Sequence, residues 1–347
     1  MEGRKSFTFY GGFDAHLHLR DGEMLARVLK YSTRQFVAAI IMPNLSPPVV
    51  TAEQVLAYRN RILSTPRVGN FVPYMTTYLT ENTDPADIRQ GYDAGIFVAA
   101  KLYPLHGTTN SAHGVVKLEK IFPTLEVMEE IGMKLLLHGE MPPSSGVDIF
   151  DREKVFIDKK LSVILKRYPK LRIVMEHITT SEACAIVRVV DNVYGTITPQ
   201  HLLYDRNALF DGGLHPHLYC MPILKRSTHT QAIQNLVLSG SKKAGLGTDS
   251  APHMNDQKYK DCGCAGVFSA PVAIESYFEF FHANDAVDKF QAFISGTMAD
   301  FYGLTLPKTE LIINEIEGGW EVPNESEGIT PFEAGKRLKW KASLTKR

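Results

Sequence analysis

The sequence predicts an α/β protein built as a (β/α)8 TIM barrel, and three observations lead to this fold class. Short apolar runs rich in β-branched residues alternate with helix-like segments along most of the 347 residues. Eight such runs occur, which is the number of strands that a closed barrel needs. Polar side chains capable of catalysis stand where several of these strands end, as they do at the C-terminal face of barrel enzymes.

The predicted strands and helices follow one another in the order that a barrel requires. After an opening strand that carries His16 and His18, the predicted strands are residues 36–42, 70–79, 96–103, 134–138, 171–177, 194–198 and 243–248. The predicted helices are residues 22–31, 51–63, 84–94, 118–131, 151–168, 180–190, 228–239 and 270–282. Thr51 and Gln54 form a capping box at the start of the second helix. An open doubly wound sheet is the structural alternative, but no G-x-G-x-x-G motif opens a helix.

Composition favours one domain and excludes several classes of partner. No linker, repeat or low-complexity segment divides the chain, so residues 1–347 are expected to form a single barrel domain, with about 307–347 packing outside it. Lys plus Arg and Asp plus Glu are 38 each, and no basic run occurs, which argues against a nucleic-acid or acidic-membrane partner. The apolar runs are too short to span a bilayer, and the N-terminus has no apolar leader.

The four cysteines give no disulfide framework in a chain of this size, and we interpret them as reduced thiols of a cytoplasmic protein. Cys262 and Cys264 form a C-x-C pair that could hold a soft metal. Without a second such pair, a structural role is the favoured interpretation.

His16 and His18 are the first candidate metal ligands. Side chains two apart on a strand point to the same face, so both imidazoles can bind at one point. One H-x-H pair is weak evidence, because most histidines are not ligands, and further ligands must come from elsewhere in the chain.

Further polar residues stand at the ends of the other predicted strands. They are Asn44, Lys101, His138, His177 and Asp249. Any one of them could be a hydrogen-bonded core or loop residue, but together they place several metal ligands at one rim of the barrel. The sequence therefore predicts a metal centre at the C-terminal face of the strands.

Lys101 is unusual because it lies inside an apolar strand that a barrel buries on both faces. Burial favours the neutral amine, which is a nucleophile able to add CO₂ and form a carbamate with two oxygen ligands. The alternative is a lysine that extends along the strand to reach solvent. With the histidines at the same rim, we prefer the carbamate.

The same motifs resemble those of bacterial dihydroorotases of the PyrC type, within the metal-dependent amidohydrolase superfamily. The resemblance runs from about residue 13 into the three-hundreds. It rests on the following segments, which occur in the order of the family: His16-Leu17-His18-Leu19-Arg20-Asp21-Gly22, Met42-Pro43-Asn44, Ala100-Lys101-Leu102-Tyr103-Pro104, Leu137-His138-Gly139-Glu140, Glu176-His177-Ile178-Thr179-Thr180, Thr198-Pro199-Gln200-His201, His217-Leu218-Tyr219-Cys220 and Gly247-Thr248-Asp249-Ser250-Ala251-Pro252-His253.

The resemblance implies a hydrolase with two zinc ions per chain. His16, His18 and Asp249 would hold one ion, His138 and His177 the other, and N6-carboxylated Lys101 would bridge them beside a hydroxide. Asp249 would act as general base and then general acid. The implied reaction is the reversible cyclisation of N-carbamoyl-L-aspartate to (S)-dihydroorotate plus water, the third step of de novo pyrimidine (UMP) biosynthesis.

The resemblance also implies a substrate site and a small-molecule substrate. Arg20, Asn44 and His253 would bind the substrate carboxylate, and main-chain groups of Met221 and Ala265 would contact the ring. Residues 107–114 would form a lid, from which Thr108 and Thr109 bind the substrate. His18 and His138 are expected to contact substrate as well as metal. A homodimer is expected.

Two other functions remain open from sequence. A hydantoinase- or allantoinase-like cyclic amidohydrolase would share the metal ligands but would not need the carboxylate site of Arg20, Asn44 and His253. A non-catalytic scaffold on the same barrel is the third candidate. Such a protein usually loses metal ligands, whereas this chain retains all six.

Overall fold

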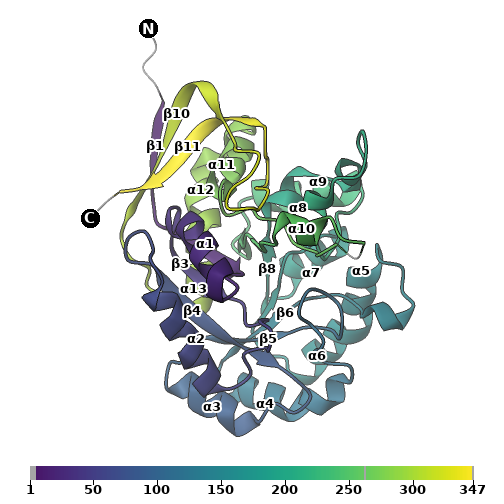
Figure 1. The fold of residues 1–347 in the computed structure, drawn as a ribbon. Helices are drawn as coiled ribbons and strands as arrows, with labels where there is room; N and C mark the ends of the chain where they lie inside the picture. Colours follow the sequence, from purple (N-terminus) through teal and green to yellow (C-terminus); the bar gives the residue numbers. More distant parts are fainter. Residues whose placement is uncertain (1–4, 262, 346–347) are drawn as a thin grey trace.

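A computed structural model describes residues 5–261 and 263–345 of the chain. Its largest sheet has eight parallel strands, each paired with the next along the chain in the order β2 to β9 (Figure 1). The strands are β2 (Gly12–Leu17), β3 (Phe36–Ile41), β4 (Val72–Leu79), β5 (Ala99–Leu102), β6 (Lys134–Leu137), β7 (Ile173–Met175), β8 (Val193–Ile197) and β9 (Ala244–Leu246).

The first and last strands of this sheet meet just beyond their C-terminal ends. Leu17 and Ser250 form a parallel bridge there. The Asp249 amide donates to His16 O (2.9 Å), and the His18 amide donates to Ser250 O (3.2 Å). These bonds nearly close the sheet, and the predicted (β/α)8 barrel is confirmed.

Helical segments connect the strands and surround the barrel (Figure 1). The α-helices are α1 (Gly22–Thr33), α2 (Ala52–Ser64), α3 (Pro85–Asp93), α4 (Phe122–Glu130), α5 (Arg152–Phe156), α6 (Ser162–Arg167), α7 (Ser181–Val189), α8 (Pro199–Leu203), α9 (Ser227–Leu238), α10 (Asn255–Lys258), α11 (Ala273–Ala283), α12 (Val287–Gln291) and α13 (Thr297–Tyr302). Short 3-10 turns are η1 (Leu118–Ile121), η2 (Pro143–Ser145), η4 (Arg206–Leu209) and η5 (Pro216–Leu218), and π-helical turns are η3 (Ile157–Leu161) and η6 (Ala292–Gly296).

Two predicted helices differ from the structure in detail. The helix predicted for residues 151–168 contains the π turn η3 between α5 and α6, and the one predicted for 118–131 begins as the 3-10 turn η1. The predicted strand 96–103 is shorter, because β5 is only Ala99–Leu102. Phe97 and Tyr103 flank it and are as deeply buried as the strand, so hydrophobicity does not mark where pairing stops.

The barrel strands are buried on both faces. Every residue of β2, β3, β5, β6, β7 and β9 is buried. Helices cover the outside and side chains fill the inside, which explains the nearly continuous apolar runs in the sequence. A polar side chain inside such a strand therefore needs a specific partner.

A second sheet, which the sequence did not predict, joins the two ends of the described chain (Figure 1). It pairs β1 (Ser6–Tyr10), β10 (Glu310–Glu321) and β11 (Arg337–Leu344) in antiparallel order β1-β10-β11. Phe7 of β1, Trp340 of β11 and Phe278 of α11 pack together, with ring centroids 5.1 to 5.4 Å apart. The single-domain organisation of residues 1–347 stays a prediction.

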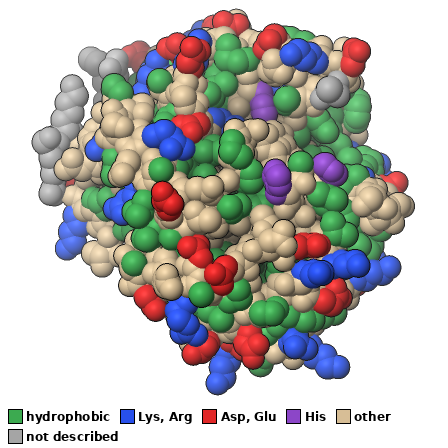
Figure 2. All heavy atoms as spheres, turned by 60° about the horizontal axis from the view of Figure 1, so that its bottom comes forward, with side chains coloured by type: hydrophobic (Ala, Val, Ile, Leu, Met, Phe, Trp, Pro, Cys, Tyr) green, Lys and Arg blue, Asp and Glu red, His purple; other side chains and the backbone are tan. Residues whose placement is uncertain are grey.

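The surface shows no dominant charge on the face seen in Figure 2, where Lys and Arg are interspersed with Asp and Glu. None of the helices in the described chain combines the length and apolar character needed to cross a membrane. Cys184, Cys220 and Cys264 are free thiols. Cys262 of the C-x-C pair lies outside the described residues.

Candidate metal centre and substrate pocket

β2 brings the two histidines of the H-x-H motif to the C-terminal rim of the barrel. His16 is in the strand and His18 follows it directly, and both side chains are buried. Their Nε2 atoms are 3.1 Å apart. Burial lowers the pKa of both imidazoles, that of His18 to about 3, so each ring is neutral and has a lone pair for a metal.

Asp249 reaches the same point from the loop after β9. Its Oδ1 lies 2.9 Å from His18 Nε2 and 3.3 Å from His16 Nε2. Burial raises the pKa of this carboxyl group, but the two imidazoles outweigh it and hold the pKa well below its ordinary value. Asp249 is therefore ionised. Its position is fixed by the hydrogen bond from its main-chain amide to His16 O, which helps to close the barrel.

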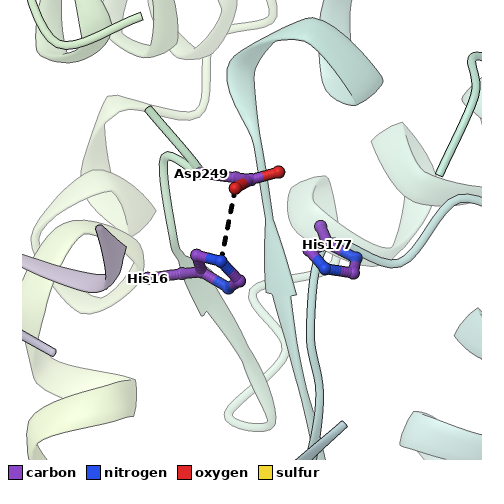
Figure 3. A group of neighbouring side chains, drawn as sticks. All are labelled: His16, His177 and Asp249. Carbon is purple, nitrogen blue, oxygen red and sulfur yellow. Dashed lines mark ion pairs between the residues drawn. The ribbon is translucent and has the colours of Figure 1, made fainter. Parts of the chain in front are cut away.

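His138 follows β6, and His177 lies two residues beyond β7. Their ring centroids are 4.6 Å apart, and the His177 ring is 5.1 Å from that of His16. Burial lowers the pKa of both. Figure 3 shows His16 and His177 converging on Asp249, so three strands contribute to one site.

This cluster fits a divalent transition metal. Candidate ligand atoms of His16, His177 and Asp249 all lie within 4.8 Å of one another. Among the described residues His177 Nδ1 is buried without a hydrogen-bond partner, which is costly unless another group, such as a metal ion, satisfies it. Neutral imidazoles with an ionised carboxylate form the donor set that zinc prefers.

Lys101 is the third residue of β5, and its side chain is fully buried. Its ammonium contacts Glu176 Oε2. The other Glu176 oxygen, Oε1, lies 3.1 Å from His16 Nδ1 but not in hydrogen-bond geometry. Burial holds the pKa of Lys101 well below its ordinary value. Lys101 thus joins the cluster through Glu176, at a depth where a neutral amine is favoured.

Arg20 and His253 form one wall beside the metal ligands. His253 Nε2 lies 3.1 Å from both Arg20 Nη2 and Ala265 O. Burial, followed by the Arg20 charge, lowers the pKa of His253 to about 2, so the ring is neutral. With its proton on Nε2, His253 donates to the Ala265 carbonyl. Arg20 Nε donates to Pro252 O (3.3 Å), which leaves the Nη groups of Arg20 for an incoming anion.

Residues 107–114 lie across the pocket. Thr109 Oγ1 donates to Ala265 O (3.1 Å), and Asn44 Nδ2 donates to Thr109 O (3.1 Å). Asn110 Nδ2 in turn donates to Asn44 O (3.0 Å). These bonds connect the segment to two walls of the pocket, an arrangement that we call closed.

The residues described above line one common pocket at the C-terminal rim of the barrel. Its lining includes predicted residues from every part of the site: His16, His18, Arg20, Asn44, Thr108, Thr109, His138, His177, Met221, Asp249 and Ala265. Tyr103, Ala251 and Gly266 also line it and were not predicted. Lys101 and His253 lie behind this lining: Lys101 contacts Glu176, which lies next to His16, and His253 contacts Arg20 and Ala265 directly.

The backbone is strained at three of the predicted positions. Arg20, His177 and Asp249 have positive φ values of 58°, 42° and 44°. Side chains other than glycine rarely adopt this conformation, and it persists where surrounding contacts impose it, often at functional sites. Each of the three residues lies just after a barrel strand, so the chain turns sharply as it enters the site.

Sequence reasoning missed the carboxylates behind the histidines. Glu140 Oε2 lies 2.9 Å from His138 Nε2, and Glu176 contacts Lys101. Both are almost fully buried. Their proximity to His138 and His177 in sequence was a usable signal, since an acidic residue beside a metal-binding histidine often orients it.

Comparison with known proteins agrees with this geometry. The Amidohydrolase family matches residues 9–300. A dihydroorotase of Escherichia fergusonii is 47% identical over 333 residues, covering 94% of this chain and 95% of that protein. The structure of dihydroorotase (pyrC) from Campylobacter jejuni has a TM-score of 0.89 at 37% identity, covering 99% of this chain and 98% of that one. Dihydroorotase from Saccharomyces cerevisiae, solved with 5-fluoroorotic acid, has a TM-score of 0.89 at 26% identity and covers 99% of both chains.

Hydantoinases are more distant. The L-hydantoinase of Arthrobacter aurescens shares the fold with a TM-score of 0.79, but it is only 15% identical and the match covers 98% of this chain and 84% of that one. Sequence, fold and site geometry agree: the chain belongs to the amidohydrolase family and, within it, to the dihydroorotases.

Proposed function

We propose that this chain is a dihydroorotase that interconverts N-carbamoyl-L-aspartate and (S)-dihydroorotate plus water. The observation that carries the assignment is the position of Arg20 in one pocket with the histidine and aspartate cluster, with His253 directly behind the guanidinium. A metal centre supplies chemistry for a cyclic amide, and the guanidinium supplies a site for the carboxylate that dihydroorotate has and simpler cyclic amides lack.

The proposed cofactor is a pair of zinc ions. His16, His18 and Asp249 would hold one ion, and His138 and His177 the other. Carboxylated Lys101 would bridge both ions, which its full burial and lowered pKa support. Bound zinc would acidify a water nucleophile and polarise the carbonyl that is attacked.

Asp249 is the proposed proton carrier. Its low pKa keeps it ionised before reaction, so the carboxylate is ready to accept the proton of the attacking water. It then gives that proton to the ring nitrogen as the amide bond breaks. In the cyclisation direction Asp249 takes the proton from the nitrogen that attacks, and the same steps run in reverse.

The rest of the pocket would bind and orient the substrate. Arg20, Asn44 and His253 are proposed to hold its carboxylate, with Thr108 and Thr109 contributing from residues 107–114. Main-chain groups of Met221 and Ala265, with His18 and His138, are proposed to contact the ring. Closing of residues 107–114 would exclude bulk water, which strengthens each of these polar contacts.

The test is a comparison of kcat/KM for dihydroorotate, dihydrouracil, hydantoin and allantoin in the unmodified protein and in Arg20→Met. Losing one charge-assisted pair in a desolvated pocket costs roughly 2–5 kcal/mol, a factor of tens to thousands in kcat/KM for dihydroorotate. Metal content should stay normal. Comparable rates on the uncharged rings, or an indifferent Arg20 variant, would favour a hydantoinase- or allantoinase-like activity instead.

We also propose that the protein works in the cytoplasm as a homodimer. Its balanced charge and unpaired thiols support the first proposal. Light scattering of the purified protein tests the second, because a mass near 38.8 kDa would show a monomer instead.

A further inference from the structure

Lys258, at the end of α10, is a buried lysine that no step of the proposed reaction uses. Its side chain is close to fully buried. The ammonium donates to three main-chain carbonyls, Tyr219 O (3.0 Å), Cys264 O (2.8 Å) and Gly266 O (2.8 Å). An ammonium group has three N–H donors, so these three bonds use its full capacity.

The three carbonyls belong to two segments that form one wall of the substrate pocket. The first leads into Met221, and the second contains Ala265; both residues line the pocket. The segments are joined directly, since the Gly266 amide donates to Tyr219 O (2.9 Å). Lys258 bonds to the same Tyr219 carbonyl and to the second segment at two places, so it holds both in one position.

Within the second segment the carbonyls alternate in direction. Cys264 O and Gly266 O face Lys258, whereas Ala265 O, between them, accepts from His253 Nε2 and Thr109 Oγ1 (both 3.1 Å). Holding the two outer carbonyls therefore fixes the direction of the central one. The Ala265 carbonyl is the point at which residues 107–114 and the carboxylate-binding wall meet.

We propose that Lys258 is a positioning residue for substrate binding: by holding the Cys264 and Gly266 carbonyls, it aims Ala265 O at His253 and Thr109. This inference rests on the proposed dihydroorotase function for its kinetic consequence. Its structural consequence is independent of that function. Without the ammonium, Ala265 O is no longer held in the position where it accepts from His253 and Thr109. The contact between residues 107–114 and this carbonyl then weakens.

The first test replaces Lys258 by Met, which preserves the length and apolar stem of the side chain but removes the donors. KM for dihydroorotate should rise about tenfold or more with a smaller change in kcat, since the loss falls on binding rather than on the proton carrier. Zinc content should stay at the level of the unmodified protein. The matched control is Lys134→Met, a buried lysine at the start of β6, on the opposite rim of the barrel; its KM should not change.

A double-mutant cycle with Thr109→Val separates positioning from general destabilisation. The readout is hydrogen exchange of residues 107–114, because Thr109 is also proposed to contact the substrate and its loss would change KM by itself. If Lys258 acts through Ala265 O, the two substitutions disrupt the same contact, and exchange in the double variant should be little faster than in Lys258→Met alone. Effects on exchange that simply multiply would overturn the proposal, as would a KM within about twofold of the unmodified value in Lys258→Met.

Hydrogen exchange gives a readout that does not depend on the reaction. The Gly266 amide and residues 107–114 should exchange faster in Lys258→Met, while the same amides stay unchanged in Lys134→Met. If the unmodified protein fails to turn over dihydroorotate, the proposed function fails and this measurement still decides the role of Lys258. Unchanged exchange at Gly266 would overturn it.

If Lys258→Met does not fold, Lys258→Arg carries the test. A planar guanidinium keeps the charge but does not match three carbonyls arranged around one nitrogen. A smaller rise in KM and faster Gly266 exchange are expected. If neither the rise in KM nor the faster Gly266 exchange is observed, the proposal is contradicted.

Discussion

The contacts of His201, a single buried side chain, determine which of its ring nitrogens carries the proton. Its Nε2 lies 2.8 Å from Pro222 O, and its Nδ1 lies 2.7 Å from Thr198 Oγ1. A carbonyl can only accept, so Nε2 carries the proton and Nδ1 accepts from the hydroxyl. Burial lowers the pKa of His201 to about 4, which keeps this neutral tautomer at neutral pH.

This lowered pKa predicts a defined loss of stability in acid. In the unfolded chain a histidine titrates near pH 6.5. Between this pH and the folded pKa, the unfolded state therefore binds a proton that the folded state does not bind. The stabilisation is complete above about pH 6.5 and is lost as the pH falls towards the folded pKa, by about 3 kcal/mol at pH 4. Urea unfolding at several pH values should show an acid loss that is larger by this amount in the unmodified protein than in His201→Gln, which keeps the other buried histidines. Parallel pH profiles of the two proteins would contradict it.

Lys101 carries a second prediction at the residue scale. Lys101→Ala removes the proposed carbamate and should lose nearly all activity, because two oxygen ligands disappear from the centre of the site. Short carboxylic acids such as acetate should restore part of the activity by occupying the vacated space. The measurement is turnover of dihydroorotate with and without added acid. Near-normal turnover of the variant in bicarbonate-free buffer would exclude a bridging role.

Residues whose chemistry is visible in a local motif could be predicted from the sequence, and those defined by distant contacts could not. The H-x-H pair needs only strand geometry to converge. Glu176 and Lys258, in contrast, matter because of atoms brought to them by the fold, Lys101 Nζ for one and Tyr219 O for the other. A lysine on a short helix has no sequence feature that marks it as buried.

Among the elements, residues 107–114 link pocket and surface through Asn110. Asn110 has a positive φ of 56°, and its side-chain amide donates a hydrogen bond to Asn44 O. Asn110→Ala should raise KM for dihydroorotate several-fold, because it loses this bond and also places an alanine in left-handed backbone at a cost of about 1 kcal/mol. Asn110→Gly relieves the strain but not the lost bond, so its KM should lie between the two. Equal KM values in all three proteins would show that the bond to Asn44 has no part in closing.

Element prediction succeeded where hydrophobic burial is local and failed where it depends on a distant partner. The capping box of Thr51 and Gln54 is confirmed at the start of α2. β11 was missed although exposed and buried residues alternate along it, a pattern typical of a half-buried strand. Its pairing partner β10 and its packing partner α11 are not indicated by any residue near 337–344. The barrel strands, buried on both faces, needed no such information.

At the scale of the whole molecule, the site predicts about two divalent ions per chain, since six ligands are too many for one tetrahedral ion. Native mass spectrometry should find this number. Removing the ions with a chelator should abolish activity and lower Tm, because ligands that bind only the folded state stabilise it. Full activity with at most one tightly bound ion would contradict the prediction. The Lys134→Met protein, altered at the opposite rim, should give the same ion count.

The junction between β2 and the loop after β9 determines when the barrel can close during synthesis. His16 is synthesised more than two hundred positions before Asp249, whose amide donates a hydrogen bond to His16 O, so the barrel can close only after Asp249 has been added. A nascent chain that has reached β8 already contains all four proposed histidine ligands but lacks the Asp249 carboxylate and the last strand of the barrel. The proposed metal ions can therefore bind their full set of ligands only after Asp249 has been synthesised and the barrel has closed.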